Sequence, residues 1–342
     1  MKKDARLDMK VNRFARPVAL AAAAAIASLL GLGAAQAQTI EIHNTMGTGG
    51  SEEAALERFS EIVAERSDGR FEVNVYLGGQ LGDETEVLEL LNLGQTQMSL
   101  TGGAFMGQYA KEYDAVSVPF VFPNWEAVEH YIMDTDSGAA MQQQAREQGN
   151  LVYLAPQMRA FRHMTSNREI NEPADLEGLT MRLPQIPVWV DVWEELGVQA
   201  VVIPAPDIYL AMRTGQVEAH ENSLASPYTR QLWEVQDYII TTGHLSFPWH
   251  WVASASWWDG LDEADREMIR EAVEEARQHG ITVERERDEF YREALIENGM
   301  TFIDVDQEPF REAAWPAVER ALADMADGVA EDIEAAIAAT AQ

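Results

Sequence analysis

The stretch Gly178-Leu-Thr-Met-Arg-Leu-Pro-Gln185 marks the end of a buried strand, and the rest of the predicted fold is arranged around it. Its apolar residues from Leu179 to Leu183 predict a short strand that ends at Pro184, since proline cannot donate to a sheet ladder. Arg182 interrupts this run one residue before its end. A guanidinium buried there needs an anionic partner, because an unpaired buried charge is costly. The sequence leaves two partners open: an Asp or Glu of the protein, or the carboxylate of a ligand held by two parallel hydrogen bonds.

The N-terminus has the pattern of a secretory signal peptide. A basic segment precedes the apolar, alanine-rich run 18–32, and Ala35-Gln36-Ala37 matches an A-x-A cleavage site. The apolar run is too short for a convincing membrane span. We therefore expect cleavage after Ala37, export to the periplasm, and a mature chain of residues 38–342 that does not insert stably into the membrane.

The mature chain is strongly acidic. The full chain has a formal net charge of −32, and the predicted signal carries +4, so residues 38–342 carry −36. Such a surface repels nucleic acid and anionic lipid, and we expect neither as a partner. The sequence contains no cysteine, which excludes disulfides and thiolate metal sites. We expect no cofactor and no metal, because the histidines and carboxylates lack the spacing of a metal-ligand motif.

Short apolar strands alternate with helices along most of the chain. A strand at 40–44 leads into a glycine-rich turn and a helix, and strands at 71–77 and 98–100 continue the pattern. This rhythm predicts an α/β fold with a mostly parallel sheet covered by helices on both faces. Residues 262–298 then predict one helix with only Gly280 as an interruption. At ~1.5 Å per residue it would be about 55 Å long, which exceeds a single domain of this size, so we expect it to span two.

The predicted organisation has two domains joined at a hinge. We assign residues 38–165 with 248–287 to domain I, and residues 166–247 with 288–342 to domain II. The chain would cross between them near 165, near 248 and within the long helix. No linker rich in Pro, Gly or Ser separates the two parts, and several crossing segments are typical of hinged proteins.

Polar side chains follow several of the predicted strands. Thr45, Arg168, Arg182 and Asn222 each stand at a strand end. In open α/β sheets, ligands bind outside the carboxyl ends of strands, so we expect these residues to converge. Two arginines and an amide suit a carboxylate, because the arginines compensate its charge and the amide fixes its orientation. Gln185, beside a predicted helix start, adds a further donor.

Five motifs in order resemble the DctP family, the extracytoplasmic solute-binding proteins of tripartite ATP-independent periplasmic (TRAP) transporters. They are Gln80-Leu-Gly-Asp83, Thr165-Ser-Asn-Arg168, Leu179-Thr-Met-Arg-Leu-Pro184, Ile208-Tyr-Leu-Ala211 with Gly215, and Glu221-Asn222. The resemblance covers roughly residues 39–320 and includes the long late helix. It implies a two-domain, periplasmic-binding-protein-like clamp whose hinge cleft closes on an organic acid, which is then delivered to the TRAP membrane permease subunits.

The resemblance also implies roles for particular residues. Arg182 corresponds to the arginine that holds the ligand carboxylate, and Arg168 and Asn222 correspond to further ligand contacts. Gln185 falls where sialic-acid binders of the family have a ligand-contacting asparagine, and Thr45 lies on the loop after the first strand.

The chain departs from the family pattern at several positions. Ser223 follows Asn222 where the family often has proline. Gly102 and Ala205 stand where sialic-acid members have an acidic and an aromatic residue. Sialic acid is therefore not the expected ligand, and the residues that contact the far end of the ligand stay undefined.

Within the organic acids, we expect a sugar acid such as a uronate or an aldonate. A cleft rich in tryptophan and lined by glycine suits a polyhydroxylated ligand, and Trp249 is a candidate for stacking on a sugar ring. The alternative is a C4-dicarboxylate or a small keto or hydroxy acid. A second carboxylate would need a second cation, which Arg159 or Arg162 could supply.

Two other functions are compatible with the sequence. A secreted hydrolase or lyase acting on acidic sugars would use His220 and Glu221 as an acid–base pair, but no nucleophile motif or metal set accompanies them. We therefore expect a binding protein and not an enzyme. A sensor subunit would use the same clamp with a different output.

Overall fold

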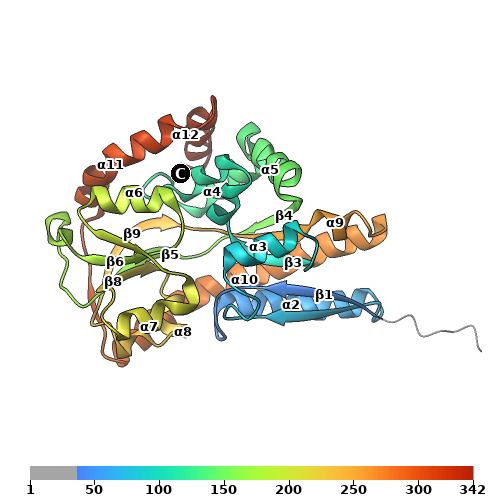
Figure 1. Ribbon diagram of the computed structural model, residues 1–342, viewed down its shortest axis with the longest axis horizontal. Coiled ribbons are helices and arrows are strands. Elements are labelled where there is room, and N and C mark those ends of the chain that lie inside the picture. Colours follow the sequence, from blue (N-terminus) through green and yellow to red (C-terminus); the bar gives the residue numbers. More distant parts are fainter. Residues whose placement is uncertain (1–36, 342) are drawn as a thin grey trace, which may run out of the picture. The chain divides into compact units, whose positions relative to one another are not determined.

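The computed structural model describes residues 37–341, so residues 1–36 of the predicted signal peptide lie outside it. The compact unit that begins at Thr39 contains two β-sheets (Figure 1). The first sheet has the strand order β2-β1-β3-β10-β4. β1 and β3 are parallel, whereas β10 runs antiparallel to both of its neighbours. The bounds are β1 Gln38–His43, β2 Phe71–Tyr76, β3 Met98–Gly102, β4 Leu151–Gln157 and β10 Trp249–Ser254.

The second sheet has the strand order β11-β9-β5-β8-β6-β7. β6 is parallel to β7 and β8, but β5 is antiparallel to β8 and β9. β11 is parallel to β9. Both sheets are therefore mixed: they contain the parallel pairs that the sequence predicts, and also antiparallel pairs made by β5 and β10, which it does not. The bounds are β5 Phe161–Ser166, β6 Thr180–Leu183, β7 Gln199–Val202, β8 Ala219–Asn222, β9 Tyr238–Ser246 and β11 Thr301–Ile303.

Helices cover both faces of each sheet, as predicted. We call the part built on the first sheet lobe 1 and the part built on the second sheet lobe 2. Lobe 1 contains α2 Ser51–Arg66, α3 Glu84–Asn92, α4 Trp125–Asp134, α5 Asp136–Gly149 and α9 Ala255–Trp258. Lobe 2 contains α6 Pro187–Glu195, α7 Ile208–Arg213, α8 Ala225–Thr229 and α11 Gln307–Ala323. Figure 1 shows α6 and α11 on one side of the second sheet and α7 and α8 on the other.

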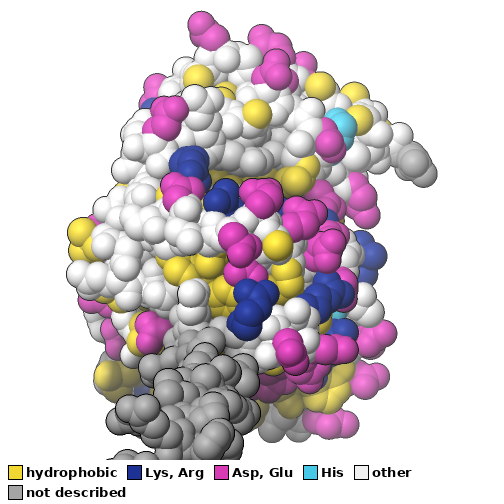
Figure 2. All heavy atoms as spheres, turned by 90° about the vertical axis from the view of Figure 1, so that its right-hand side faces the viewer, with side chains coloured by type: hydrophobic (Ala, Val, Ile, Leu, Met, Phe, Trp, Pro, Cys, Tyr) yellow, Lys and Arg dark blue, Asp and Glu magenta, His cyan; other side chains and the backbone are white. Residues whose placement is uncertain are grey.

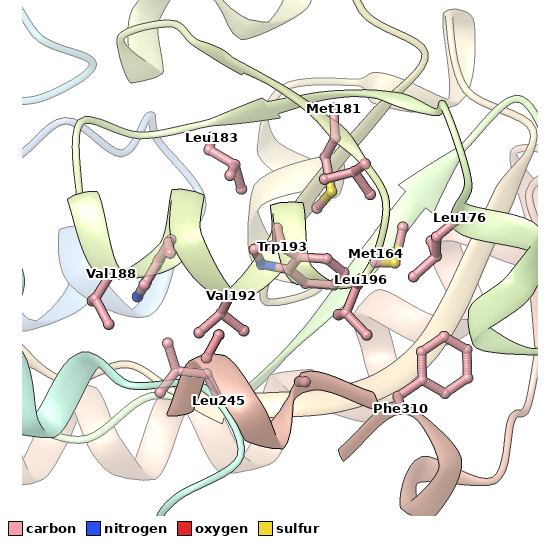
Figure 3. Close-up of a cluster of buried hydrophobic side chains, with 14 of the residues drawn as sticks. Met164, Leu176, Met181, Leu183, Val188, Val192, Trp193, Leu196, Leu245 and Phe310 are labelled. Carbon is pink, nitrogen blue, oxygen red and sulfur yellow. The ribbon is translucent and has the colours of Figure 1, made fainter. Parts of the chain in front are cut away.

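The core of lobe 2 holds the strand β6 in place. Trp193 of α6 is fully buried among side chains of β6 and α11, including Met181, Leu183 and Phe310 (Figure 3). β6 ends at Leu183, immediately before Pro184, as the sequence predicted. Burial of Met181 and Leu183 fixes the register of the strand, and this register brings Arg182 beside Val201 and His220 of the neighbouring strands.

The long helix α10, at Glu263–Glu297, belongs to both lobes (Figure 1, orange). Ile269 and Ala276 pack in the cluster around the first sheet, whereas Tyr291 and Leu295 pack against β9 and α8 of the second. The predicted domain-spanning helix is thus confirmed. Gly280 lies at the close approach of α10 to α2 and β4, where an added Cβ would meet the side chains of Gln157 and Ala55 at 2.7 and 2.9 Å.

The pairing of strands and the packing of helices bear on where the chain crosses between lobes. β5 belongs to the second sheet, so the first crossing follows β4 and precedes residue 161, and not near 165 as we expected. The second crossing lies between β9 and β10, close to the expected residue 248. α12, at Val329–Thr340, packs with lobe 1, although we assigned it to domain II. The domain boundaries themselves stay a prediction.

Candidate ligand-binding pocket

A pocket lies between the two lobes, at the end of β6 where Arg182 is located. Lobe 1 contributes residues from the loops after β1 and β3, from α3 and from β10, and lobe 2 contributes residues from β5, β6, β8 and α8. The lining consists of Thr45, Met46, Glu84, Phe105, Arg159, Arg162, Arg182, Pro184, Ile186, Trp189, Ala205, Asn222, Arg230, Phe247 and Trp249. Four arginines and one carboxylate are therefore the charged groups of this pocket.

Arg182 is buried in the pocket without a counterion. Only 3% of its surface is exposed, and its Nε donates to the carbonyl oxygen of Ile203 at 2.7 Å. No carboxylate of the described residues lies within ion-pair distance of it. Burial lowers the pKa of Arg182 to about 9, while the more distant Glu221 and Glu84 oppose this shift. A buried cation in this state is stabilised by an anion that enters the pocket.

Arg230, just after α8, is the second arginine of the pocket without an ion pair. Its Nη2 donates to the carbonyl oxygen of Thr45 at 3.2 Å, across the gap between the lobes. Its Nε is buried and has no hydrogen-bond partner among the described residues, although part of the side chain reaches the surface. Burial lowers the pKa of Arg230, and the nearby Glu84 opposes that shift. Arg230 was not among the site residues predicted from the sequence.

Arg162 forms an ion pair with Glu221 of β8, in lobe 2. Its Nε and Nη2 bond the two carboxylate oxygens of Glu221 at 2.5 and 2.8 Å, and His244 Nε2 lies 3.1 Å from the same carboxylate. Burial would raise the pKa of Glu221, but Arg162 and the bond from His244 lower it to about 2. The pair is therefore ionised, and its two charges cancel.

Arg159 pairs with Glu52 of α2, in lobe 1. Its Nε lies 2.8 Å from Glu52 Oε1, at an angle unsuited to a hydrogen bond, so the contact is an ion pair. Its Nη2 donates to Ser223 Oγ at 2.8 Å. Trp249 Nε1 also donates to Glu52 Oε1 at 2.8 Å, and the Arg159 guanidinium lies 5.1 Å from the centre of the Trp249 ring.

The side chains that line the pocket, taken together with the carboxylates that pair directly with them, carry one net positive charge. Arg159 and Arg162 are neutralised by their carboxylates, and Arg182 and Arg230 are not. Glu84, which accepts a hydrogen bond from Thr45 Oγ1 at 2.6 Å, provides one negative charge. Its place is fixed because it begins α3, behind the N-cap residue Asp83 and its capping box. A ligand with a single carboxylate would neutralise the site.

The structure brings together four of the six residues that the sequence selected. Arg182, Asn222, Thr45 and Trp249 all line the pocket. Asn222 Oδ1 accepts from the Ser223 amide at 3.0 Å, and no described residue accepts from its Nδ2. Trp249 is almost fully buried and its indole is engaged by Glu52 and Arg159, so it forms part of the wall.

Gln185 lines an adjoining cavity. This cavity shares Glu84, Phe105, Arg182, Pro184 and Ala205 with the pocket and continues past Asp83 and Thr85 at the start of α3. Gln185 itself is exposed.

Arg168 does not lie with the other predicted site residues. Its guanidinium donates to the carbonyl oxygens of Asp175 and Glu177 and lies 3.6 Å from Glu218, with 40% of the side chain exposed. The prediction that it converges with Arg182 rested on parallel strands. β5 runs antiparallel to β8, whereas β6 runs parallel to β8. The carboxyl end of β5 therefore lies at the opposite end of the strands from Arg182. Arg162, near the amino end of the same strand, occupies the pocket instead.

His220 and Glu221, the acid–base pair of the hydrolase or lyase hypothesis, make structural contacts. Glu221 is bound by Arg162 and His244, and His220 is fully buried between β5 and β6. Burial lowers the pKa of His220 far below its usual value, and the neighbouring Arg182 adds to the shift. In the part of the chain that the structure describes, no cluster of three or more metal-ligating side chains is present.

The chain as a whole is strongly acidic, with a formal net charge of −32. Figure 2 shows carboxylates spread over one face of the molecule and interspersed with arginines. Such a surface repels small anions at long range, so affinity for a carboxylate must come from the local cations of the pocket. None of the described helices is long and apolar enough to cross a membrane.

Comparison with known proteins assigns the family. Residues 43–324 match the family of bacterial extracellular solute-binding proteins, family 7, known as DctP. The chain belongs to this family. The DctP resemblance predicted from the five motifs is thus confirmed.

Several DctP relatives are similar over most of their length. A solute-binding protein of Roseobacter denitrificans is 29% identical over 92% of this chain and 94% of its own. Its crystal structure, a TRAP periplasmic solute-binding protein with bound L-galactonate, covers 88% of this chain and 99% of its own with a TM-score of 0.82. The C4-dicarboxylate-binding periplasmic protein DctP of Rhodobacter capsulatus is 28% identical over 83% of this chain and 86% of its own.

Proposed function

We propose that this DctP protein captures a sugar acid with one carboxylate in the pocket at Arg182. The observation that carries the proposal is the charge count: Arg182 and Arg230 lack ion pairs, and Glu84 offsets one of them. A monoanion brings the site to neutrality, whereas a dianion would leave a buried negative charge. In this scheme Arg182 binds the carboxylate through charge-assisted hydrogen bonds, and the Asn222 amide sets its orientation.

The remaining polar groups suit hydroxyls at the far end of the ligand. Glu84 has acceptor capacity beyond its bond from Thr45, and the adjoining cavity adds the side chains of Thr85 and Gln185. Glu84 and Asp83 would repel a second carboxylate placed there. The structure of the relative from Roseobacter denitrificans contains L-galactonate, an aldonate, which agrees with this reading.

A C4-dicarboxylate is the second candidate ligand. Arg230 favours it, because a second unpaired guanidinium could bind a second carboxylate. The relative from Rhodobacter capsulatus carries the name of a C4-dicarboxylate-binding protein. Binding of a dicarboxylate with a free energy comparable to that of a sugar acid would require Glu84 to be protonated or displaced.

Capture requires movement of the two lobes. Arg182 is almost inaccessible, and Arg230 joins lobe 2 to the loop after β1, so a ligand enters only when the lobes part. A bound acid then stabilises the closed form through contacts that the open form lacks. We propose that the chain is exported, cleaved after Ala37, and acts without catalysis by delivering its ligand to TRAP permease subunits.

A calorimetric and thermal-shift screen of residues 38–342 tests the proposal. The panel contains L-galactonate, D-galacturonate, D-glucuronate, D-erythronate and succinate. A ligand at about 100 times its dissociation constant adds about 2.7 kcal/mol to the free energy of unfolding. We expect a sugar acid to bind most tightly and Arg182→Ala to abolish the effect, with Arg168→Ala as a matched control that retains it. No carboxylate binding, or binding that is indifferent to Arg182, would overturn the proposal.

A further inference from the structure

A second, larger cavity lies on the other side of the chain segment that crosses from β4 to β5. Its volume is about 870 Å³, and it is lined by Ala160, Phe161, His244 and Glu284, among others. The neighbouring residues Arg159 and Arg162 line the ligand pocket instead. The crossing segment therefore forms a thin wall between the two cavities, and its side chains point to one or the other. We call the second cavity the rear groove.

A chain of polar contacts connects Arg159 to Glu284 of α10 through Glu52 and Ser51, the first residues of α2. Arg159 pairs with Glu52 at 2.8 Å. Ser51 Oγ lies 3.4 Å from Glu52 Oε2 and donates to Glu284 Oε2 at 2.6 Å. The amide of Ala160 donates to the other oxygen of Glu284 at 3.0 Å. One end of this relay faces the ligand and the other end lines the rear groove.

The relay contains two buried carboxylates and a single guanidinium. Glu52 is completely buried and Glu284 is 2% exposed. Burial raises the pKa of Glu284, and the charge of Glu52 raises it further, while Arg159 and the bonds from Ser51 and Ala160 oppose the shift. The other charged or titratable groups near Glu284 come from three more elements besides its own helix. They are Arg285, Arg287, Asp288 and Tyr291 of α10, His163 of β5, His244 of β9, and Glu308 and Arg311 of α11.

We propose that Ser51 and Glu284 position Arg159 through Glu52, and that Glu284 takes up one proton when an anionic ligand binds in the pocket. This inference rests on the proposed binding of a carboxylate in the Arg182 pocket. The ligand adds a negative charge near Arg159 and weakens the compensation that this arginine gives to Glu52. A proton from solvent in the rear groove then binds Glu284 Oε2. The Ser51 hydroxyl, released from Glu284, turns to donate to Glu52.

The proposal predicts that binding is linked to pH. Because the ligand-bound form holds one proton more than the free form, ligand affinity rises as pH falls through the titration range of Glu284. One proton per ligand corresponds to a change of about tenfold in the dissociation constant per pH unit within that range. The ligand's own carboxylate stays ionised above about pH 5, so it does not contribute there.

Isothermal titration calorimetry of mature protein at several pH values between 5 and 8, each in two buffers that differ in their enthalpy of ionisation, measures the protons taken up per ligand. The probe is the sugar acid of the panel that binds most tightly. We expect uptake approaching one proton in the unaltered protein and none in Glu284→Gln, which keeps the acceptor of the Ala160 amide. Asp288→Asn is the matched control: it lies on the same helix and the same groove, without a bond to the relay, and should retain uptake.

Ser51→Ala provides a second test if Glu284→Gln unfolds the protein. Ionised Glu284 would lose a stabilising hydroxyl, so uptake should move to higher pH, a result that a purely structural role would not produce. Equal heats in both buffers for the unaltered protein, or loss of uptake in Asp288→Asn, would overturn the relay and leave the ligand assignment intact. Absence of heat with every sugar acid would overturn the ligand assignment and the relay together.

Discussion

Arg162 and Arg168 lie six residues apart at opposite ends of β5 and have opposite environments. Arg162 is buried, bonded to both oxygens of Glu221 and faces the pocket. Arg168 is 40% exposed and bonds main-chain carbonyls at the far edge of the sheet. Arg162 is buried, so its charge must be compensated by a carboxylate of the protein. Arg168 is exposed, so water solvates its charge. The direction of a strand thus decides which of two similar residues belongs to a site.

The largest effect should follow from removing the pocket arginine. We expect Arg162→Ala to lower the free energy of unfolding by about 3–5 kcal/mol, because Glu221 would stay buried without its partner. Urea denaturation measures this. A loss below ~1 kcal/mol, the value typical of exposed pairs, would show that the two ends of β5 are equivalent.

Acid should weaken the pocket end of β5 without substitution. The pKa of Glu221 is about 2 in the folded protein, below its ordinary value of 4.5, so the stability it contributes is present above about pH 4.5 and is lost as pH falls toward 2. The full contribution is about 3 kcal/mol. The free energy of unfolding, measured by urea denaturation at each pH, should fall more steeply with decreasing pH in the unaltered protein than in Glu221→Gln. Parallel curves would contradict the ionised pair.

Arg182→Ala should separate ligand binding from stability. We expect ligand affinity to fall about 100-fold, or about 3 kcal/mol, because the carboxylate loses its charge-assisted bonds. The free energy of unfolding without ligand should stay the same or rise, since an uncompensated buried charge is removed. Arg182→Lys, which keeps the charge but not the paired donors, should restore part of the affinity.

Arg230→Gln should change ligand preference more than affinity. We expect about a tenfold loss for a sugar acid, because one charge-assisted bond is replaced by a neutral one. Succinate binding, if present, should fall further. An equal loss for both ligands would show that Arg230 serves closure through Thr45 and does not read the ligand.

Arg168→Ala should have the smallest effect of the five. The exposed contact with Glu218 is of a kind that contributes ~0–1 kcal/mol, and the residue is distant from the pocket. Both the midpoint of urea denaturation and the ligand dissociation constant should stay close to those of the unaltered protein. A tenfold loss of affinity would return Arg168 to the site.

The sequence predicted the local features that depend on neighbouring residues. Pro184 ends β6, Asp262 and Asn298 bound the long helix, and the buried arginine of β6 lies in the pocket. The ends of β6 and of the long helix follow from a backbone restriction and from the periodicity of one segment. The burial of the arginine follows from the apolar run around it. None of the three requires knowledge of a partner strand.

The features that depend on distant partners were not predicted. The antiparallel direction of β5 moved Arg168 away, and no local pattern specifies it. Arg230 and Glu84 enter the pocket through the packing of α8 and α3, and no local pattern in either sequence marks them as site residues. Ion pairs such as Arg159 with Glu52 join residues more than a hundred positions apart, which spacing alone cannot reveal.

The position of β10 and α10 late in the chain affects how the protein folds as it is made. β10 lies between β3 and β4, and α10 covers the first sheet, yet both follow the whole of β5 to β9 in sequence. In a chain that is made from its N-terminus, β2, β1 and β3 can therefore pair early, but β4 cannot join them until β10, which ends at Ser254, and the helix after it are available. The core of lobe 1 therefore cannot be completed until most of the chain has been synthesised, a delay that would favour export of an unfolded chain.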